Sequence, residues 1–365
     1  MFKSIKMKPE QLICYIAPAA PATRRPATGK EPPVRVEIGF TPNWYRRRLD
    51  IDFGEKWHND PAYRKETVIA MRNELNKRFP GCNIGKMSDE PDLLTGVYGA
   101  NMTSSIYGIP IIYSKDNWPN SAHKPLSDQE MKDLVPPDLD NNLFFKNFLT
   151  QLDWIQKDQG KIIGFINWQG ILNNAYRLRG QQIFIDMYEN QELLMHLMDC
   201  VCTTMIHATS RLRERQKAGN VGYNFFTVSN CLVNMISPEN YRDFIMPFDI
   251  KISREFSSMG IHNCAWNAGP YLDYYANVPN IGYIDMGIES DLEKAKKLFP
   301  DARRAVMYTP MDLNSKSLTQ IKEDINMIAN SFAPCDIELA DIEDGTTDAK
   351  VLKFIEIVEG ISSKI

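Results

Sequence analysis

The sequence has no long hydrophobic run. None of its apolar segments reaches the roughly 18–20 residues that a helix needs to cross a bilayer. Basic residues are not in excess either, because 42 lysines and arginines stand against 46 acidic residues and give a formal net charge of −4. A chain of this charge has no general attraction to nucleic acids or anionic membranes. We therefore expect neither among its partners.

Cysteine is scarce and irregularly placed, with seven in 365 residues. An odd number at irregular spacing in a long chain argues against a disulfide framework and favours the reducing cytoplasm. Internal repeats and low-complexity tracts are lacking as well, apart from a stretch rich in proline and alanine near the N-terminus. We expect residues 1–32 to form a flexible N-terminal arm, in which the apolar segment is too short for a secretory signal.

Strand and helix patterns alternate along the rest of the chain. Hydrophobic residues make up 43% of the sequence, which is ample for a core. Short apolar runs predict strands, and longer segments with a period near 3.6 predict the helices between them. The predicted strands are 34–40, 162–167, 223–228, 258–262, 283–286, 304–308 and 336–340. This alternation is typical of a (β/α)8 TIM barrel, so we expect an α/β fold with a single barrel domain over residues 33–365.

A His-x-Cys pair, His262 and Cys264, follows one of these strands. If the strand continues through both residues, their side chains point to the same face roughly 6–7 Å apart, and an imidazole and a thiolate can bind one ion. Cys335 is the most suggestive third ligand, and a set of one histidine and two cysteines suits a catalytic zinc with an open fourth position. From spacing alone, a buried histidine and two unrelated small hydrophobic cysteines remain the alternative.

The barrel hypothesis explains why these separated residues belong together. Active sites of this fold lie at the C-terminal ends of the strands, and we expect His262, Cys264 and Cys335 to meet there. Asp285 ends the next predicted strand, and it is our candidate catalytic residue. It can serve as a displaceable fourth zinc ligand or as a base, and it can equally be an ordinary acidic residue bonded to a loop.

Three sets of residues resemble motifs of one enzyme family. The segment Ile236–Phe244 followed by Pro247 is similar to its Ser-Pro-Glu-x-Tyr run, and Arg177–Gly180 followed by Asp186 and Met187 is similar to its Arg-Gly and Asp-Met elements. The His-x-Cys pair with a later lone cysteine is the third. From about Pro33 onward, the chain resembles the uroporphyrinogen decarboxylase superfamily, in particular its zinc-dependent cobamide methyltransferases of the methylcobamide:coenzyme M type.

Two departures from the family pattern bear on the pocket. Ala265 stands where the family usually has glycine, and the stretch after Cys335 is not the usual short proline-rich turn. The substrate pocket is therefore expected to differ from that of the family.

The resemblance implies a zinc-dependent methyltransferase. Zinc held by His262, Cys264 and Cys335 would activate a thiol or similar acceptor, which would take a methyl group from a cobalt corrinoid carried on a separate small protein. The chemistry needs such an ion because a free thiol has a pKa near 8.5, whereas a thiol that coordinates zinc is deprotonated outright. The acceptor and the direction of transfer stay open.

A corrinoid partner would have to approach the mouth of the barrel. Our candidates for contacting it are Trp44, Arg46, Trp118 and Trp266, because aromatic and arginine side chains are favoured as interface anchors. Simpler explanations stay open for some of them. The arginines after Trp44 can face solvent or pair with Asp50 and Asp52, and Trp266 can pack over the metal-binding loop.

Two other functions stay open on the same fold. One is a lyase that resembles uroporphyrinogen decarboxylase and acts on a carboxylated substrate without a cofactor. That activity needs an N-terminal motif resembling Arg-Gln-Ala-Gly-Arg, and the sequence offers only Arg46–Arg48 in a different setting. The other is a non-catalytic barrel that binds a corrinoid.

Overall fold

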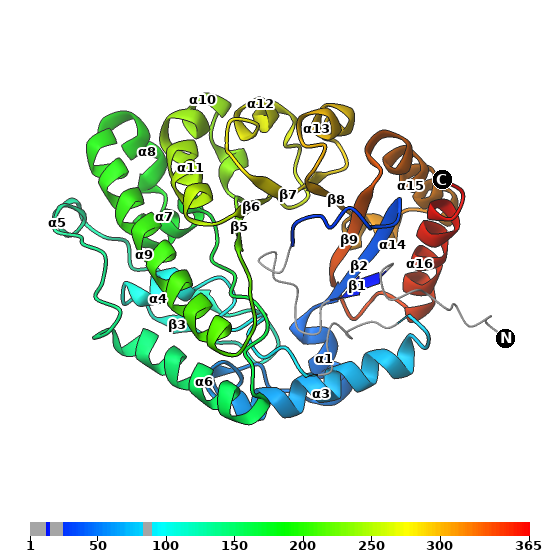
Figure 1. Cartoon of the computed structure of the whole chain (residues 1–365), viewed down its shortest axis with the longest axis horizontal. Helices are drawn as coiled ribbons and strands as arrows, with labels where there is room; N and C mark the ends of the chain where they lie inside the picture. The colour runs from blue at the N-terminus through cyan, green and yellow to red at the C-terminus, as the bar shows by residue number, and fades with distance from the viewer. Residues whose placement is uncertain (1–11, 15–24, 83–89) are drawn as a thin grey trace.

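The centre of the protein is a parallel sheet of seven strands. The structure is a computed structural model that describes residues 12–14, 25–82 and 90–365. The strands are arranged in the order β1-β2-β9-β8-β7-β6-β5. Their bounds are Leu12–Cys14 (β1), Val34–Phe40 (β2), Phe225–Ser229 (β5), Ser258–His262 (β6), Ile281–Gly287 (β7), Arg303–Met307 (β8) and Cys335–Ile342 (β9). Figure 1 shows these strands around the centre of the molecule with the helices outside them.

A helical segment follows each strand of the C-terminal half. These helices are α10 (Pro238–Asn240), α11 (Met246–Glu255), α12 (Leu272–Tyr275), α13 (Leu292–Leu298), α14 (Pro310–Ser315), α15 (Leu318–Phe332) and α16 (Asp348–Ser362). Three more helices precede β5, namely α7 (Ile171–Arg179), α8 (Gln182–Glu189) and α9 (Gln191–Ala218). Because consecutive strands from β5 to β9 pair side by side and in parallel, their C-terminal ends meet at one edge of the sheet. That edge is where a site can form.

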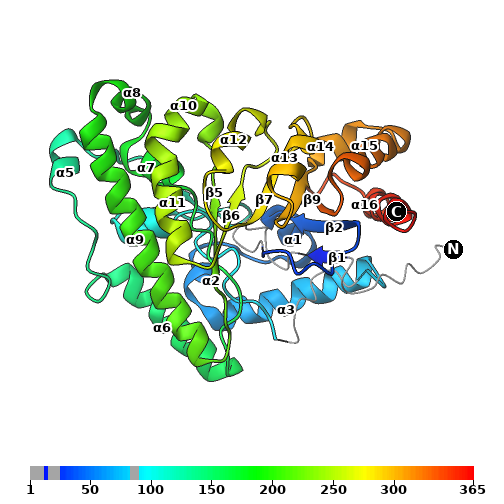
Figure 2. The ribbon, with the colours of Figure 1, turned by 45° about the horizontal axis from the view of Figure 1, so that its top comes forward.

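The N-terminal half supplies helices and little sheet. Its helices are α1 (Pro42–Leu49), α2 (Glu55–Asn59), α3 (Pro61–Arg78), α4 (Met102–Ile106), α5 (Asp128–Lys132) and α6 (Leu143–Gln159). Figure 2 shows the long helices α3 and α6 below the sheet. The short strands β3 (Ile111–Ile112) and β4 (Asn120–Ser121) form a separate antiparallel pair. No described helix has the length and apolar character to cross a membrane.

The α/β class is confirmed, but the described residues do not form a closed ring of eight strands. No ladder joins β5 to β1, and the segment 162–167, where we predicted a strand, is a largely buried stretch without strand pairing. Gly164 gives one reason. Its φ of 101° lies in the left-handed region, and a Cβ there would come within 2.0 Å of the Asp92 carboxylate. The segment still reaches β5, where the Gly170 N–H donates to the Ser229 carbonyl at 2.8 Å.

The predicted N-terminal arm is described only in part. Leu12–Cys14 pairs in parallel with β2, while residues 1–11 and 15–24 lie outside the described residues. The expectation of a flexible arm before a single domain therefore stays a prediction.

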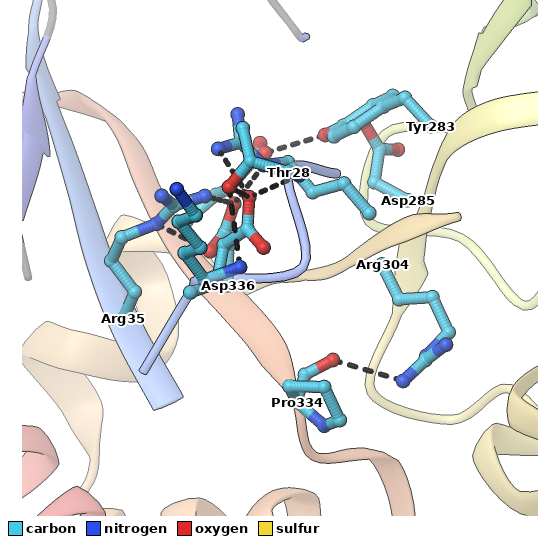
Figure 3. A network of polar contacts seen from close by, with 11 residues as sticks. Thr28, Arg35, Tyr283, Asp285, Arg304, Pro334 and Asp336 are labelled. Atoms are coloured by element: carbon cyan, nitrogen blue, oxygen red, sulfur yellow. Dashed lines mark hydrogen bonds and ion pairs between the residues drawn. The ribbon is translucent and has the colours of Figure 1, made fainter. Parts of the chain in front are cut away.

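Buried ion pairs support the end of the sheet where the strands begin. The Arg35 guanidinium donates twice to the Asp336 carboxylate, with both distances 2.7 Å, and the two side chains are only 6% and 2% exposed. Arg303 and Glu31 extend the network, and Thr28 donates to Glu31 at 2.8 Å. Figure 3 shows this network beside β2 and β9. A buried charge that loses its partner is costly, so this pairing holds the two strands in register.

We predict that Asp336→Asn destabilises the protein by about 3–5 kcal/mol, because the buried Arg35 loses its counterion. The free energy of unfolding in urea measures the effect. Asp158→Asn is the matched control: its ion pair with Lys65 is about one-third exposed, and we expect a loss of at most about 1 kcal/mol. Equal losses in the two variants would contradict this assignment.

Candidate metal centre

The site begins where β5 and β6 end. Ser229 is aligned with His262, the last residue of β6. One residue further along, the Asn230 N–H donates to the His262 carbonyl at 2.8 Å. This bond extends the pairing by one step and places Cys231 beside the end of β6.

Cys231, His262 and Cys264 form one compact cluster. Their potential ligand atoms all lie within 4.8 Å of one another. The Cys264 Sγ is 2.9 Å from the Cys231 Sγ and 3.1 Å from the His262 Nε2. His262 is buried, and the two cysteines are half-buried. A histidine and two cysteines at this spacing are the donor set of a zinc site that keeps a position open.

The local backbone differs from the predicted strand. β6 ends at His262, and Cys264 sits in a turn with φ of 56°, which is uncommon for a residue other than glycine. We predicted that His262 and Cys264 would meet because a strand continues through both residues. The two side chains do meet, but a turn and not a strand brings them together. A neighbouring strand supports the turn. The Gly287 N–H donates to the Trp266 carbonyl at 2.9 Å, and a Cβ at Gly287 would lie 2.1 Å from the Ala265 oxygen.

Asp285 lies behind His262, on the side away from the cysteines. The His262 Nδ1–H donates to the Asp285 Oδ2 at 2.6 Å, so the Nε2 atom is left to face the two thiols. The other oxygen of Asp285 accepts from the Asn263 N–H at 2.7 Å, and the Tyr283 hydroxyl donates to Oδ2 at 2.7 Å. A carboxylate that holds a histidine in one tautomer is the usual support of a metal-binding imidazole. The structure thus places Asp285 as the partner of His262.

The electrostatics of the cluster favour one thiolate. A hydrogen bond from Cys264 lowers the pKa of Cys231 well below its usual value and outweighs the effect of burial. The same contact raises the pKa of Cys264, because the neighbouring sulfur carries the negative charge. Burial opposes a charge on His262, but the attraction of Asp285 prevails and raises the pKa of His262 to about 10.

Cys335 does not belong to the cluster, and our predicted ligand set is corrected here. Cys335 is the first residue of β9, aligned with Val34 at the start of β2, whereas the site lies where the strands end. Eight residues of strand separate the two ends, a span of roughly 20 Å. Burial raises the pKa of Cys335, so its thiol stays protonated at neutral pH. We expected Cys335 to lie beside the predicted strand 336–340 and to meet His262 and Cys264 at the strand ends, but β9 begins with it.

The four predicted contact residues lie in different places. Trp44 is 0% exposed and packs against Phe40 in the core, so our expectation that it lies on the rim is corrected. Arg46 is partly exposed on α1 and lies 4.0 Å from Asp50, which is the simpler of the two roles we considered.

Two of the tryptophans do lie near the site. Trp266 is half-buried and packs edge-to-face on Tyr271 beside the turn that holds Cys264. Trp118 is half-buried and lines a cavity of about 360 Å³ together with Asn167, whose side chain accepts a hydrogen bond from the Ser229 hydroxyl at the end of β5. Trp118 therefore lies close to the mouth of the site.

Sequence reasoning missed Cys231. A lone cysteine has no spacing partner, and it is more often a small buried hydrophobe than a ligand. One signal was present, because Cys231 follows a predicted strand end just as His262 does, and parallel strand ends converge.

The donor set fits a zinc ion. With a Zn–S distance of about 2.3 Å and a Zn–N distance of about 2.05 Å, a tetrahedral site sets its sulfurs about 3.7 Å apart and each sulfur about 3.5 Å from the nitrogen. The observed distances of 2.9 and 3.1 Å are shorter, so the side chains need to separate by less than 1 Å to admit the ion. Thiolates and an imidazole supported by a carboxylate favour zinc over magnesium or calcium, which prefer oxygen ligands.

The fold and the cluster together define an α/β protein with a candidate Cys2His metal site at the C-terminal edge of its parallel sheet. No family model and no curated protein match the sequence. Among solved structures, the chain is similar to a methyltransferase from Methanosarcina mazei, with a TM-score of 0.64 and 14% identity over 98% of this chain and 95% of that one. This likeness shows a shared fold.

A second solved structure is more distant. It is a B12-independent methionine synthase from Shewanella sp. W3-18-1, with a TM-score of 0.45 and 9% identity over 91% of this chain and 97% of that one. A likeness of this degree carries no argument about function.

We predict that purified protein binds about one zinc per chain, and that Cys231→Ser lowers its zinc affinity at least tenfold because a harder ligand replaces a thiolate. Cys335→Ser is the matched control, since it changes a cysteine outside the cluster and should leave affinity unchanged. Competition with a chromogenic chelator gives both affinities. Loss of zinc in Cys335→Ser, with Cys231→Ser unaffected, would restore the ligand set that the sequence suggested.

Proposed function

We propose that the protein is a zinc-dependent methyltransferase that moves a methyl group between a corrinoid protein and a thiol or similar acceptor. The single observation that carries the proposal is the cluster of Cys231, His262 and Cys264, with Asp285 behind His262. A fold shared with a methyltransferase and the sequence motifs that resemble cobamide methyltransferases support it.

Zinc in this donor set would supply a substrate thiolate at neutral pH, because a coordinating thiol is deprotonated outright. Two anionic cysteines lower the Lewis acidity of the ion. That suits a nucleophilic sulfur better than it suits activation of water.

The residues of the chain prepare the site for this chemistry. Asp285 fixes the tautomer of His262, so Nε2 is the atom presented to the ion. Asn263 in turn holds Asp285 with two hydrogen bonds. Its backbone N–H donates to the Asp285 carboxylate at 2.7 Å, and its side-chain amide donates to the Asp285 backbone carbonyl, also at 2.7 Å. Tyr275 donates to the Asn263 side chain at 2.7 Å. The imidazole is thus held by buried groups, and little reorganisation is needed when substrate binds.

The partner in this proposal is a corrinoid protein that docks over the edge where the strands end. Trp118 and Trp266 are the predicted contact residues that lie near that edge, and they are the ones we retain. The contact has to form and break in every turnover, so we expect a small and partly polar interface.

The alternative decarboxylase gains no support from the arginines it would need. Arg47 and Arg48 both pair with Asp344, and the Arg48 guanidinium also lies 4.1 Å from the Trp44 ring. These cations already have partners, so they do not offer a site for substrate carboxylates.

We predict that zinc-loaded protein demethylates methylcobalamin in the presence of a suitable thiol, and that Asp285→Asn slows the reaction about 10- to 100-fold because His262 loses its orienting carboxylate. The decay of the methylcobalt absorbance measures the rate. Asp273→Asn is the control, since that exposed residue pairs with Lys294 outside the site and should leave the rate unchanged. If zinc binds but a panel of thiols and folates leaves the spectrum unchanged, methyl transfer is refuted.

A further inference from the structure

The segment Ile236–Phe244 with Pro247 has no role in the site described so far. Ser237 begins it by capping the short helix α10, where it accepts from the Asn240 N–H at 3.1 Å. Residues 241–245 then form a π-helical turn before α11. Pro247 gives a reason for this turn, because proline has no N–H to donate to the carbonyl four residues earlier. Such wide turns are frequent at functional sites.

Tyr241, at the start of the wide turn, contacts a buried carboxylate on α11. Its hydroxyl donates to the Asp249 Oδ2 at 2.9 Å, and the same oxygen accepts from the Asn230 side-chain amide at 3.2 Å. All three residues are 0% exposed. Among the described residues, no basic side chain pairs with Asp249, and its Oδ1 has no hydrogen-bond partner. A carboxylate buried with neutral partners alone is costly, so its presence calls for a reason other than stability.

Asn230 lies directly before Cys231, and contacts hold it on three sides. Its N–H donates to the His262 carbonyl at 2.8 Å. Its side-chain oxygen packs against Gly170, where a Cβ would lie 2.1 Å away, so this close approach needs a glycine. Its side-chain amide donates to Asp249. Because its backbone and its side chain are both fixed, Asn230 sets the direction in which the chain enters Cys231.

The residue after Cys231 is held as well. The Leu232 N–H donates to the Asn173 Oδ1 at 3.1 Å, and Asn173 belongs to α7. The two neighbours of Cys231 are therefore tied to two different helices, one to α11 through Asp249 and the other to α7. Neither tie uses an atom of the metal cluster itself, so each can be altered while all three candidate ligands stay in place.

We propose that Asp249 is a positioning residue of the metal centre, which holds Asn230 and thereby fixes the turn of Cys231. Tyr241 holds the Asp249 carboxylate in turn. This inference rests on the proposed function and deepens it, because it assigns the residues outside the cluster that set the place of one ligand. The Cys231 Sγ lies 2.9 Å from the Cys264 Sγ. A displaced turn would separate the two sulfurs and weaken their joint binding of an ion.

The test measures zinc affinity and the free energy of unfolding in the same full-length variants. We expect Asp249→Ala to lower zinc affinity about 10- to 100-fold, as the loss of an outer partner of a metal ligand does. Asp249→Asn should recover most of the affinity, because an amide oxygen still accepts from both Tyr241 and Asn230. A residue that serves stability alone would change the unfolding and leave the affinity of the folded protein unchanged.

Tyr241→Phe and Tyr98→Phe form a matched pair. Both tyrosines are 0% exposed, and each variant removes one buried hydroxyl. The Tyr98 hydroxyl contacts Asn59 and Gln151 in the N-terminal half, away from the cluster. We expect Tyr241→Phe to weaken zinc binding roughly 3- to 10-fold and Tyr98→Phe to leave it unchanged.

The tyrosine pair carries the test if Asp249→Ala fails to fold. Native zinc affinity in folded Asp249→Ala or in Tyr241→Phe, or an equal loss of affinity in Tyr98→Phe, would overturn the proposal.

Cross-linking of metal-free protein separates this proposal from the function on which it rests. Glutathione disulfide is the probe: the thiols of Cys231 and Cys264 lose their protons and join in a disulfide, while the probe is reduced to two glutathione thiols. Mass spectrometry of the joined peptides gives the rate. We expect Asp249→Ala to react about tenfold more slowly than native protein, because the two sulfurs no longer meet. Tyr98→Phe should react at the native rate.

The two failures are then distinct. If the slower cross-linking in Asp249→Ala appears while zinc fails to bind to native protein, the positioning role stands and the methyltransferase function falls. If zinc binds and methyl transfer proceeds, but the Asp249 variants match native protein in zinc affinity and in cross-linking rate, the positioning role alone is refuted.

Discussion

The hydrogen bond between His262 and Asp285 is the contact on which the site depends. Asp285 is 0% exposed, and a carboxylate so deeply buried has to be fully hydrogen-bonded to be tolerated. His262, Asn263 and Tyr283 meet that need from two adjacent strands and the turn after them. The same contacts that stabilise the buried charge also aim the His262 Nε2 at Cys231 and Cys264. The bonds that stabilise the buried Asp285 carboxylate are therefore also the bonds that position His262 for the proposed function.

The parallel sheet explains how three distant residues reach one point. Each residue follows the end of a strand or forms it, and parallel strands end at a common edge. The left-handed turn at Cys264 completes the arrangement at some conformational cost, which is the kind of local strain that folded proteins retain at functional sites. The buried pairing of Arg35 with Asp336 secures the opposite end of the sheet, so the fold is stabilised independently of the site.

Much of the fold could be predicted from the sequence, because the predicted strands 34–40 and 258–262 match β2 and β6, and α/β alternation is a strong periodic signal. The lack of strand pairing in segment 162–167 could not be predicted, because its apolar pattern is that of a strand. The left-handed backbone of Gly164 interrupts this pattern, and nothing in the local sequence distinguishes that glycine from others. For the site, local spacing found His262 and Cys264. The third cysteine depended on which end of a strand each candidate occupied. Cys335 precedes the predicted strand 336–340, whereas Cys231 follows the predicted strand 223–228, and this position identifies the ligand where local spacing does not.

The role of Asp285 shows a further limit. Its position at a strand end was readable, but whether it would face the ion or the histidine depends on side-chain geometry that no local pattern encodes. A motif places such a residue in a family context, and only the surrounding structure shows what it contacts.

X-ray absorption at the zinc K-edge of the metal-loaded protein measures the ligands of the ion. We expect two sulfur ligands at about 2.3 Å and one imidazole nitrogen at about 2.0 Å, with one further light atom from solvent or substrate. Removing Cys231 should reduce the sulfur count to one. A zinc shell made only of oxygen and nitrogen, or one whose sulfur count does not change in Cys231→Ser, would contradict this ligand set.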